Sequence, residues 1–191
     1  MTTLTYRPAL AAIAALSLVT LSACSEEPAA SDDLTTQERT SQTVAAIVGE
    51  RSDLSILSDE LSDSGLSAIF DGQASYTVLA PLDTAFEGME GGTELLSDET
   101  KGALVAAILR EHIVPGALSP DAIREAIADN GGPVTVRSFG EGDLNFALEG
   151  DKIVVTGPNG TKATMAGGAL VGSNGVVIPI DGVLATLPGE A

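Results

Sequence analysis

The spacing of hydrophobic positions changes along the chain, from a helical period to a strand period. Residues 43–64 repeat apolar side chains three and four positions apart, which predicts two short amphipathic helices. Gly49 is the expected break between them, and Ser52 is the expected N-cap of the second. Residues 97–112 predict the longest helix of the chain, with Ser97 as its N-cap. The first half of the chain is therefore expected to be mainly helical.

A single strand is expected within this helical half. Residues 76–80 are mostly β-branched, aromatic or aliphatic, and Pro81 ends the run. Asp83 then suits the N-cap of a short helix that buries Phe86.

After one more helix from Ser119 to Asn130, the hydrophobic period falls to about two residues. The short strands expected in this half are 134–137, 144–148, 152–155, 163–165 and 176–178. Turn signals such as Asn174-Gly175 separate them, since both residues tolerate positive φ. A helical half followed by a strand-rich half predicts an α+β domain with an antiparallel sheet.

Residues 1–23 have a different character from the rest. They carry one charge, Arg7, followed by an apolar run of about 15 residues, shorter than the ~20 that a membrane-spanning helix needs. This pattern predicts a secretory signal peptide. An uncleaved anchor and a buried core helix are the alternatives.

The end of this segment, Leu21-Ser22-Ala23-Cys24, resembles the bacterial lipobox, in which a signal peptidase cuts before a lipid-modified cysteine. The resemblance implies that Cys24 carries acyl chains, which would make the membrane a partner of the protein. An inert thiol is the alternative. Ser25, in the place where Asp is associated with inner-membrane retention, favours the outer membrane if the source is diderm.

The remaining organisation follows from composition. Residues 24–42 are rich in acidic, Ser, Thr and Ala residues, which predicts a flexible acidic tether. Residues 43–188 form the expected domain, and 189–191 a C-terminal tail.

Charge and residue counts exclude several classes of function. The formal net charge is −18, which disfavours nucleic-acid binding. One Cys and one His cannot supply an internal disulfide, a cysteine-rich zinc site or a His-rich metal centre. No phosphate-binding, dinucleotide-binding or nucleophile-elbow motif is present. We therefore expect no cofactor, no dedicated metal site and no catalytic residue. Calcium is expected to screen the many carboxylates only diffusely and weakly.

Three segments in order resemble the sequence boxes of the fasciclin domain family. They are YTVLAPLDTAF at 76–86, ILREHIVPG at 108–116 and NGVVIPIDGVL at 174–184. The resemblance implies the family fold, an α+β wedge of two small β-sheets with several packed helices. It also implies a noncatalytic role in adhesion or matrix interaction outside the cell. The positions that match the family pattern are Thr77, Ala80, Pro81, Asp83, Phe86, His112, Pro115, Gly116, Asn174, Gly175 and Asp181.

Three positions depart from the family pattern. Leu82 replaces the usual Thr or Ser, Glu111 replaces the Tyr of the Tyr-His pair, and Ile178 replaces the His of the last box. The receptor binding credited to the Tyr-His region of animal members therefore does not carry over to this chain.

The matching residues are expected to be mostly structural. His112 suits the C-terminus of its helix, where a cationic or hydrogen-bonding imidazole is stabilised by the helix dipole. Asp181 is expected to accept backbone hydrogen bonds beside the last strand.

The leading hypothesis is a lipoprotein of the bacterial envelope that acts as an adhesion or protein-interaction module, with an unknown surface, matrix or envelope protein or glycan as partner. A periplasm-facing lipoprotein that supports envelope stability or the stress response is the alternative. A hydrolase that uses His112 is a third hypothesis.

Overall fold

The computed structural model describes residues 38–39, 41–71, 74–140 and 142–185. The predicted signal peptide, the lipobox with Cys24, most of the predicted tether and the predicted tail at 189–191 lie outside the described residues. In the part that is described, no helix has both the length and the hydropathy needed to cross a membrane.

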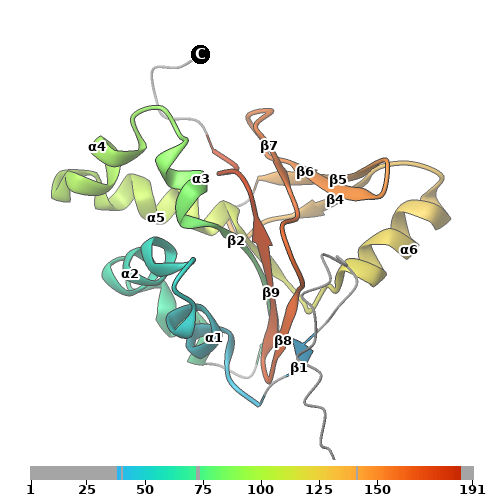
Figure 1. The fold of residues 1–191 in the computed structure, drawn as a ribbon, viewed down its shortest axis with the longest axis horizontal. Helices are drawn as coiled ribbons and strands as arrows, with labels where there is room; N and C mark the ends of the chain where they lie inside the picture. Colours follow the sequence, from blue (N-terminus) through green and yellow to red (C-terminus); the bar gives the residue numbers. More distant parts are fainter. Residues whose placement is uncertain (1–37, 40, 72–73, 141, 186–191) are drawn as a thin grey trace, which may run out of the picture. The chain divides into compact units, whose positions relative to one another are not determined.

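The described elements combine helices with two small sheets, so the α+β class is confirmed (Figure 1). The helices are α1 (Val44–Glu50), α2 (Ser55–Asp63), η1 (Leu66–Asp71), α3 (Asp83–Glu87), α4 (Gly92–Ser97), η2 (Glu99–Lys101), α5 (Gly102–Glu111) and α6 (Pro120–Asn130). The strands are β1 (Glu38–Arg39), β2 (Tyr76–Pro81), β3 (Ile113–Pro115), β4 (Val134–Arg137), β5 (Asp143–Glu149), β6 (Lys152–Thr156), β7 (Lys162–Thr164), β8 (Leu170–Gly172) and β9 (Gly175–Ile180).

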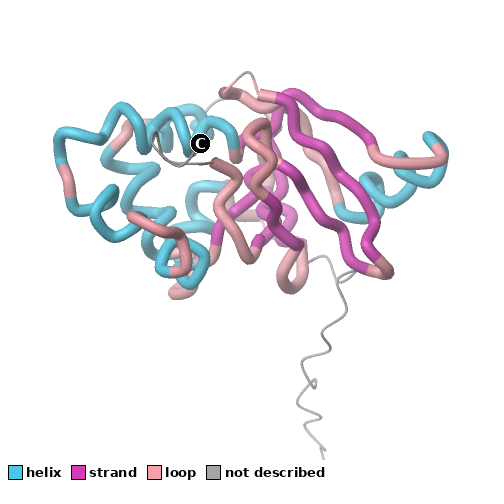
Figure 2. The backbone as a smooth tube through the Cα atoms, turned by 90° about the horizontal axis from the view of Figure 1, so that it is seen from above, coloured by secondary structure: helices cyan, strands magenta, loops and turns pink. Residues whose placement is uncertain are grey.

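The first sheet has the strand order β1-β8-β9-β2-β3 and separates two hydrophobic cores. Helices α1–α5 lie on one side of it, and strands β4–β7 with α6 lie on the other (Figures 1 and 2). Successive side chains of a strand point to opposite faces. Val78 therefore joins the helical core while its neighbour Leu79 joins the core shared with the second sheet. Val177 and Ile178 divide in the same way, so the central strands are buried on both faces.

Strand pairing corrects the expectation of one antiparallel sheet. The second sheet, β4-β5-β6-β7, is antiparallel throughout. The first sheet is mixed, because β2 and β9 pair in parallel, with Tyr76 opposite Gly175 and Pro81 opposite Ile180. Parallel neighbours need a long connection, which here contains helices α3 to α6, strands β3 and β8 and the whole second sheet.

The helix predicted over 97–112 is present as α5 but begins later, and α6, with 11 residues, is longer than α5, with 10. The chain forms α4, the 3-10 turn η2 and then α5, and the break falls at Asp98. Asp98 has extended backbone, and its carboxylate accepts a hydrogen bond from the Thr100 N–H at 3.0 Å. Ser97 is not an N-cap, since its hydroxyl donates back to the Thr93 carbonyl. An acidic residue in a helical pattern can start a new turn because its side chain competes for backbone N–H groups.

The C-terminal end of the predicted tether is part of the sheet. Glu38 pairs with Leu170 and Arg39 with Val171, both in parallel. The Ser173 N–H also donates to the Gln42 carbonyl at 2.8 Å. Strand pairing uses backbone groups, which every residue carries, so polar composition alone did not reveal this contact.

Candidate functional site

His112 is a buried structural residue at the end of α5. Its exposed fraction is 1%, and it is the C-cap residue of the helix. The Nδ1 atom lies 2.9 Å from the Ile108 carbonyl oxygen, and the Leu184 N–H donates to Nε2 at 2.9 Å. A carbonyl can only accept and an amide N–H can only donate. The imidazole is therefore neutral, with its proton on Nδ1, and it joins α5 to the chain just beyond β9.

The electrostatics of His112 agree with this geometry. Burial lowers its pKa from 6.5 to about 4, and the hydrogen bond to Ile108 opposes that shift more weakly. Of the two states expected for this imidazole, the neutral hydrogen-bonding one is supported and the cationic one is wrong. Because both ring nitrogens are bonded to backbone groups, neither is free to take a proton from a hydroxyl nucleophile.

Asp83 caps a helix, although not the helix that follows it. Its Oδ1 accepts from the Ile56 N–H at 3.0 Å and its Oδ2 accepts from the Ser55 hydroxyl at 2.6 Å. These contacts satisfy the N-terminus of α2, whose own N-cap residue, Leu54, makes no side-chain cap. The caps expected from Ser52 for α2 and from Asp83 for α3 are therefore both wrong. A carboxylate beside a helix N-terminus is also favoured by the helix dipole.

Asn174 connects three segments that are distant in sequence. Its Oδ1 accepts from the Val44 N–H at 2.8 Å, and its Nδ2 donates to the Phe70 carbonyl at 2.5 Å. It thus ties the β8–β9 connection to the start of α1 and to η1. The expected hairpin is present, with Gly172 opposite Gly175. Gly175 itself begins β9 and is not a turn residue.

Thr77 fixes the exit from β3. Its buried hydroxyl donates to the Gly116 carbonyl and accepts from the Leu118 N–H, each at 2.7 Å. Pro115 pairs with Tyr76 at the edge of the sheet. The chain therefore leaves α5 through the short strand β3, and Thr77 holds the loop that follows it.

The other matching residues also serve the fold. Asp181 accepts the Thr164 N–H at 2.6 Å through its Oδ1, as expected for a carboxylate beside the last strand. Ala80 and Phe86 are buried in the helical core. Pro81 ends β2 opposite Ile180.

The three positions that depart from the family pattern are also structural. Ile178 is buried between the sheets and Leu82 packs on the helical core. The Glu111 carboxylate accepts a hydrogen bond from the Ser138 hydroxyl, and the Ser138 hydroxyl accepts the Gly142 N–H at 3.1 Å. Glu111 thereby holds the loop between β4 and β5.

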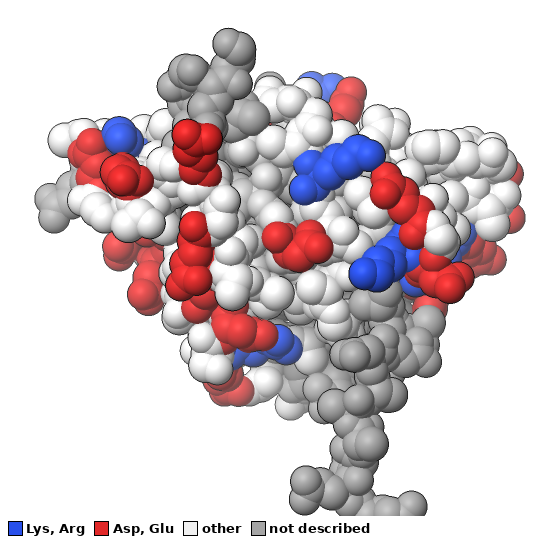
Figure 3. Space-filling model, turned by 45° about the horizontal axis from the view of Figure 1, so that its top comes forward, with Lys and Arg blue, Asp and Glu red and all other residues white. Residues whose placement is uncertain are grey.

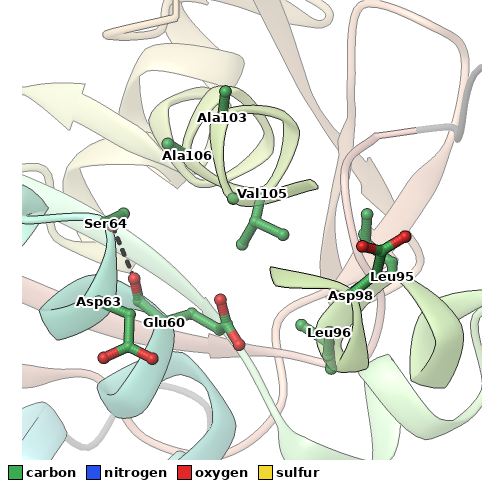
Figure 4. A pocket seen from close by; sticks show the side chains of 10 residues that line it. Glu60, Asp63, Ser64, Leu95, Leu96, Asp98, Ala103, Val105 and Ala106 are labelled. Carbon is green, nitrogen blue, oxygen red and sulfur yellow. Dashed lines mark hydrogen bonds between the residues drawn. The ribbon is translucent and has the colours of Figure 1, made fainter. Parts of the chain in front are cut away.

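A separate hollow of about 530 Å³ lies among α2, α4 and α5 (Figure 4). We call it the α2–α5 groove. It is lined by Glu60, Asp63, Ser64, Leu95, Leu96, Asp98, Gly102, Ala103, Val105 and Ala106. None of the family-matching residues lines it. Its members come from three segments, so sequence reasoning found no signal for it.

The described residues hold no group of three or more His, Cys, Asp or Glu side chains placed to bind a metal ion.

Comparison with known proteins agrees with the fold. The model of the fasciclin domain family matches residues 52–186, so the chain belongs to that family. Protein sll1483 of Synechocystis sp. is 28% identical over 144 residues, which is 74% of this chain and 72% of that protein. A solved FAS1 domain pair from the insect cell adhesion molecule fasciclin I is 28% identical, with a TM-score of 0.55. That alignment covers 66% of this chain and 43% of the solved domain pair, so it spans less than half of that pair's length.

The resemblance to the fasciclin family and the predicted fold class are thus both confirmed. Fasciclin domains are cell-adhesion and protein-interaction modules and are generally noncatalytic. In this chain the side chains that carry the family pattern hold strands, helix ends and loops together.

Proposed function

We propose that this protein is a noncatalytic adhesion or protein-interaction module, held at the bacterial envelope by lipid on Cys24. The observation that carries the proposal is the fasciclin fold with its one imidazole occupied by backbone hydrogen bonds. A hydrolase that uses His112 would need an imidazole nitrogen in contact with a nucleophile or with solvent. Neither nitrogen meets that need, so binding is the function that the geometry favours.

The envelope location rests on the lipobox-like segment before Cys24. Several acyl chains on one residue anchor a protein far more firmly than one chain does. The polar, acidic stretch that follows would place the domain at some distance from the bilayer. The insect relative is described as a cell adhesion molecule, which supports adhesion as the use of this fold here.

The Cys24→Ser substitution tests the anchor. We expect the wild-type chain in the membrane fraction, released only by detergent, and the variant as a soluble or unprocessed species. The acyl acceptor is the thiol, and serine cannot replace it. Cell fractionation followed by immunoblotting measures the distribution, with Ser25→Ala as the matched control that keeps the thiol. A mature-size Cys24→Ser protein in the membrane fraction would contradict the proposed anchor.

Binding of the purified lipid-free chain to washed cells, glycans and envelope extracts tests the interaction role. We expect saturable binding. We also expect that the same chain turns over no substrate of an ester and glycan panel. Protease treatment of intact cells then separates a domain that faces outward from one that faces the periplasm. Absence of binding to all of these preparations would remove the support for an adhesion module.

A further inference from the structure

We propose that the α2–α5 groove binds a basic amphipathic segment of a partner protein, one that presents Arg or Lys beside apolar side chains. This inference rests on the proposed function, because it names the partner chemistry and the surface of the interaction module.

The floor of the groove is apolar. Leu95 is buried, Leu96 is half-buried, and Val105 and Ala106 belong to the face of α5 that packs on the helical core. In Figure 4, Val105 from α5 points into the space between α2 and α4. A volume of about 530 Å³ falls within the range of ~300–1,000 Å³ typical of ligand-binding pockets. The floor can therefore bury the apolar part of an incoming side chain.

One wall of the groove is acidic and lacks a cation. Glu60 extends from α2 across the space toward Leu96 (Figure 4), and Asp63 follows one turn later. Ion pairs among the described side chains join Arg51 to Asp53, Lys101 to Asp98, and Lys162 to Glu149. None of these pairs includes Glu60 or Asp63. Partial burial, with the nearby charges of Asp63 and Asp59, raises the pKa of Glu60.

The carboxylate on the opposite wall, that of Asp98, already has partners of its own. The Asp98 carboxylate accepts from the Thr100 N–H at 3.0 Å and lies 3.6 Å from the Lys101 ammonium. An incoming cation would therefore meet Glu60 and Asp63 first. Arg and Lys suit this arrangement because their apolar stems can lie on the floor while their charged ends reach the carboxylates.

The surrounding surface favours the same ligand class. The chain has 27 acidic and 9 basic residues, and on the face shown in Figure 3 acidic side chains are widely spread, with basic ones among them. Such a field attracts cationic segments and repels polyanions. The apolar floor distinguishes a peptide from a simple metal ion, which would gain nothing from Leu95, Leu96 or Val105. It also distinguishes an amphipathic segment from oligolysine.

The experiment measures binding of a fluorescein-labelled peptide with Arg and Leu at helical spacing to the lipid-free chain. The test variants are Glu60→Gln/Asp63→Asn, which removes the acidic wall, and Ala103→Phe, which fills the groove from an exposed position of α5. The matched controls are Glu125→Gln/Asp129→Asn, with the same charge change on exposed positions of α6, and Ala107→Phe, at an exposed position one turn further along α5 that does not line the groove.

We expect both test variants to weaken binding about tenfold or more, and both controls to change it less than about twofold. Replacing Arg by Gln in the peptide should abolish binding, and oligolysine should bind more weakly than the amphipathic peptide. Urea unfolding checks that the variants fold. We expect Glu60→Gln/Asp63→Asn to be at least as stable as wild type, because it relieves repulsion between like charges.

Equal loss in the α2 and α6 charge variants would overturn the inference, since binding would then reflect net charge. Full binding by Ala103→Phe would also overturn it. A groove that binds the peptide while the chain binds no cell or extract would contradict the adhesion role and leave the groove standing. Cell binding that Ala103→Phe leaves unchanged would contradict the groove and leave the adhesion role standing.

Discussion

Gly175→Ala is expected to lower the free energy of unfolding by about 3–5 kcal/mol, or to prevent folding. A Cβ atom on Gly175 would overlap the carbonyl oxygen of Tyr76 and would lie 2.9 Å from the Val44 side chain. Tyr76 and Gly175 are paired residues of β2 and β9. Relief of the overlap would therefore separate the two central strands that are buried in both cores. Urea unfolding followed by circular dichroism measures the loss.

Gly132→Ala is the matched control for this prediction. A Cβ at Gly132 meets no atom within 4 Å, so its effect should stay within about 0.5 kcal/mol. If Gly175→Ala were as stable as Gly132→Ala, the described register of β2 against β9 would be wrong.

His112→Gln is expected to have the second largest effect, about 2–3 kcal/mol at pH 7. Glutamine cannot occupy both the Ile108 carbonyl and the Leu184 N–H with the rigid geometry of an imidazole. Buried backbone groups that lose their partners each cost roughly 1–3 kcal/mol. The loss should appear in urea unfolding at pH 7.

The same residue makes stability depend on pH. The pKa of His112 is lowered to about 4 in the folded chain, from 6.5 without the fold. Between these values the unfolded state binds more protons, so stability rises with pH. The contribution is fully present above pH 6.5 and falls by up to about 3 kcal/mol as the pH drops to 4. The difference in free energy of unfolding between wild type and His112→Gln should shrink as the pH falls from 6.5 to 4. Taking this difference cancels the titration of the carboxylates that both chains share.

NMR observes this group directly, since the chain has one His. At pH 5.5 the ring should remain neutral, with the proton on Nδ1 and slow exchange with water. An imidazole that titrates near 6.5 would contradict its burial and would return His112 to the list of candidate catalytic residues.

Much of the fold was predictable because its signals are local. The run at Tyr76 became β2, the Ser119-Pro120 pair began α6, and the turn before Gly175 joined two antiparallel strands. Each depends on residues close together in the sequence, where spacing and turn chemistry act. The segments that resemble the fasciclin family added the expectation of two small sheets with packed helices, which spacing alone did not give.

The contacts that failed prediction are long-range. Asp83 caps α2 from 27 positions away, and Asn174 reaches Val44 across 130 positions. Both residues also suit local caps and turns, so their type does not reveal which backbone groups they bind. The parallel pairing of β2 with β9 and the sheet contact of Glu38 are hidden for the same reason.

The α2–α5 groove belongs to this second group. Its acidic wall lies on α2 and its apolar floor on α4 and α5. In the sequence, Glu60 and Asp63 are two of 27 acidic residues, which makes a solvated helix face the default interpretation. Only the packing of three helices distinguishes them from the others.

The central claim is that a folded binding domain is displayed at the envelope through Cys24. Adherence and aggregation of a deletion strain, complemented with the full chain, test it most directly. We predict that the wild-type chain and Ser25→Ala restore adherence, while Cys24→Ser, expressed at an equal level, does not. A deletion strain that adheres and aggregates like the parent, or full restoration by Cys24→Ser, would contradict the claim.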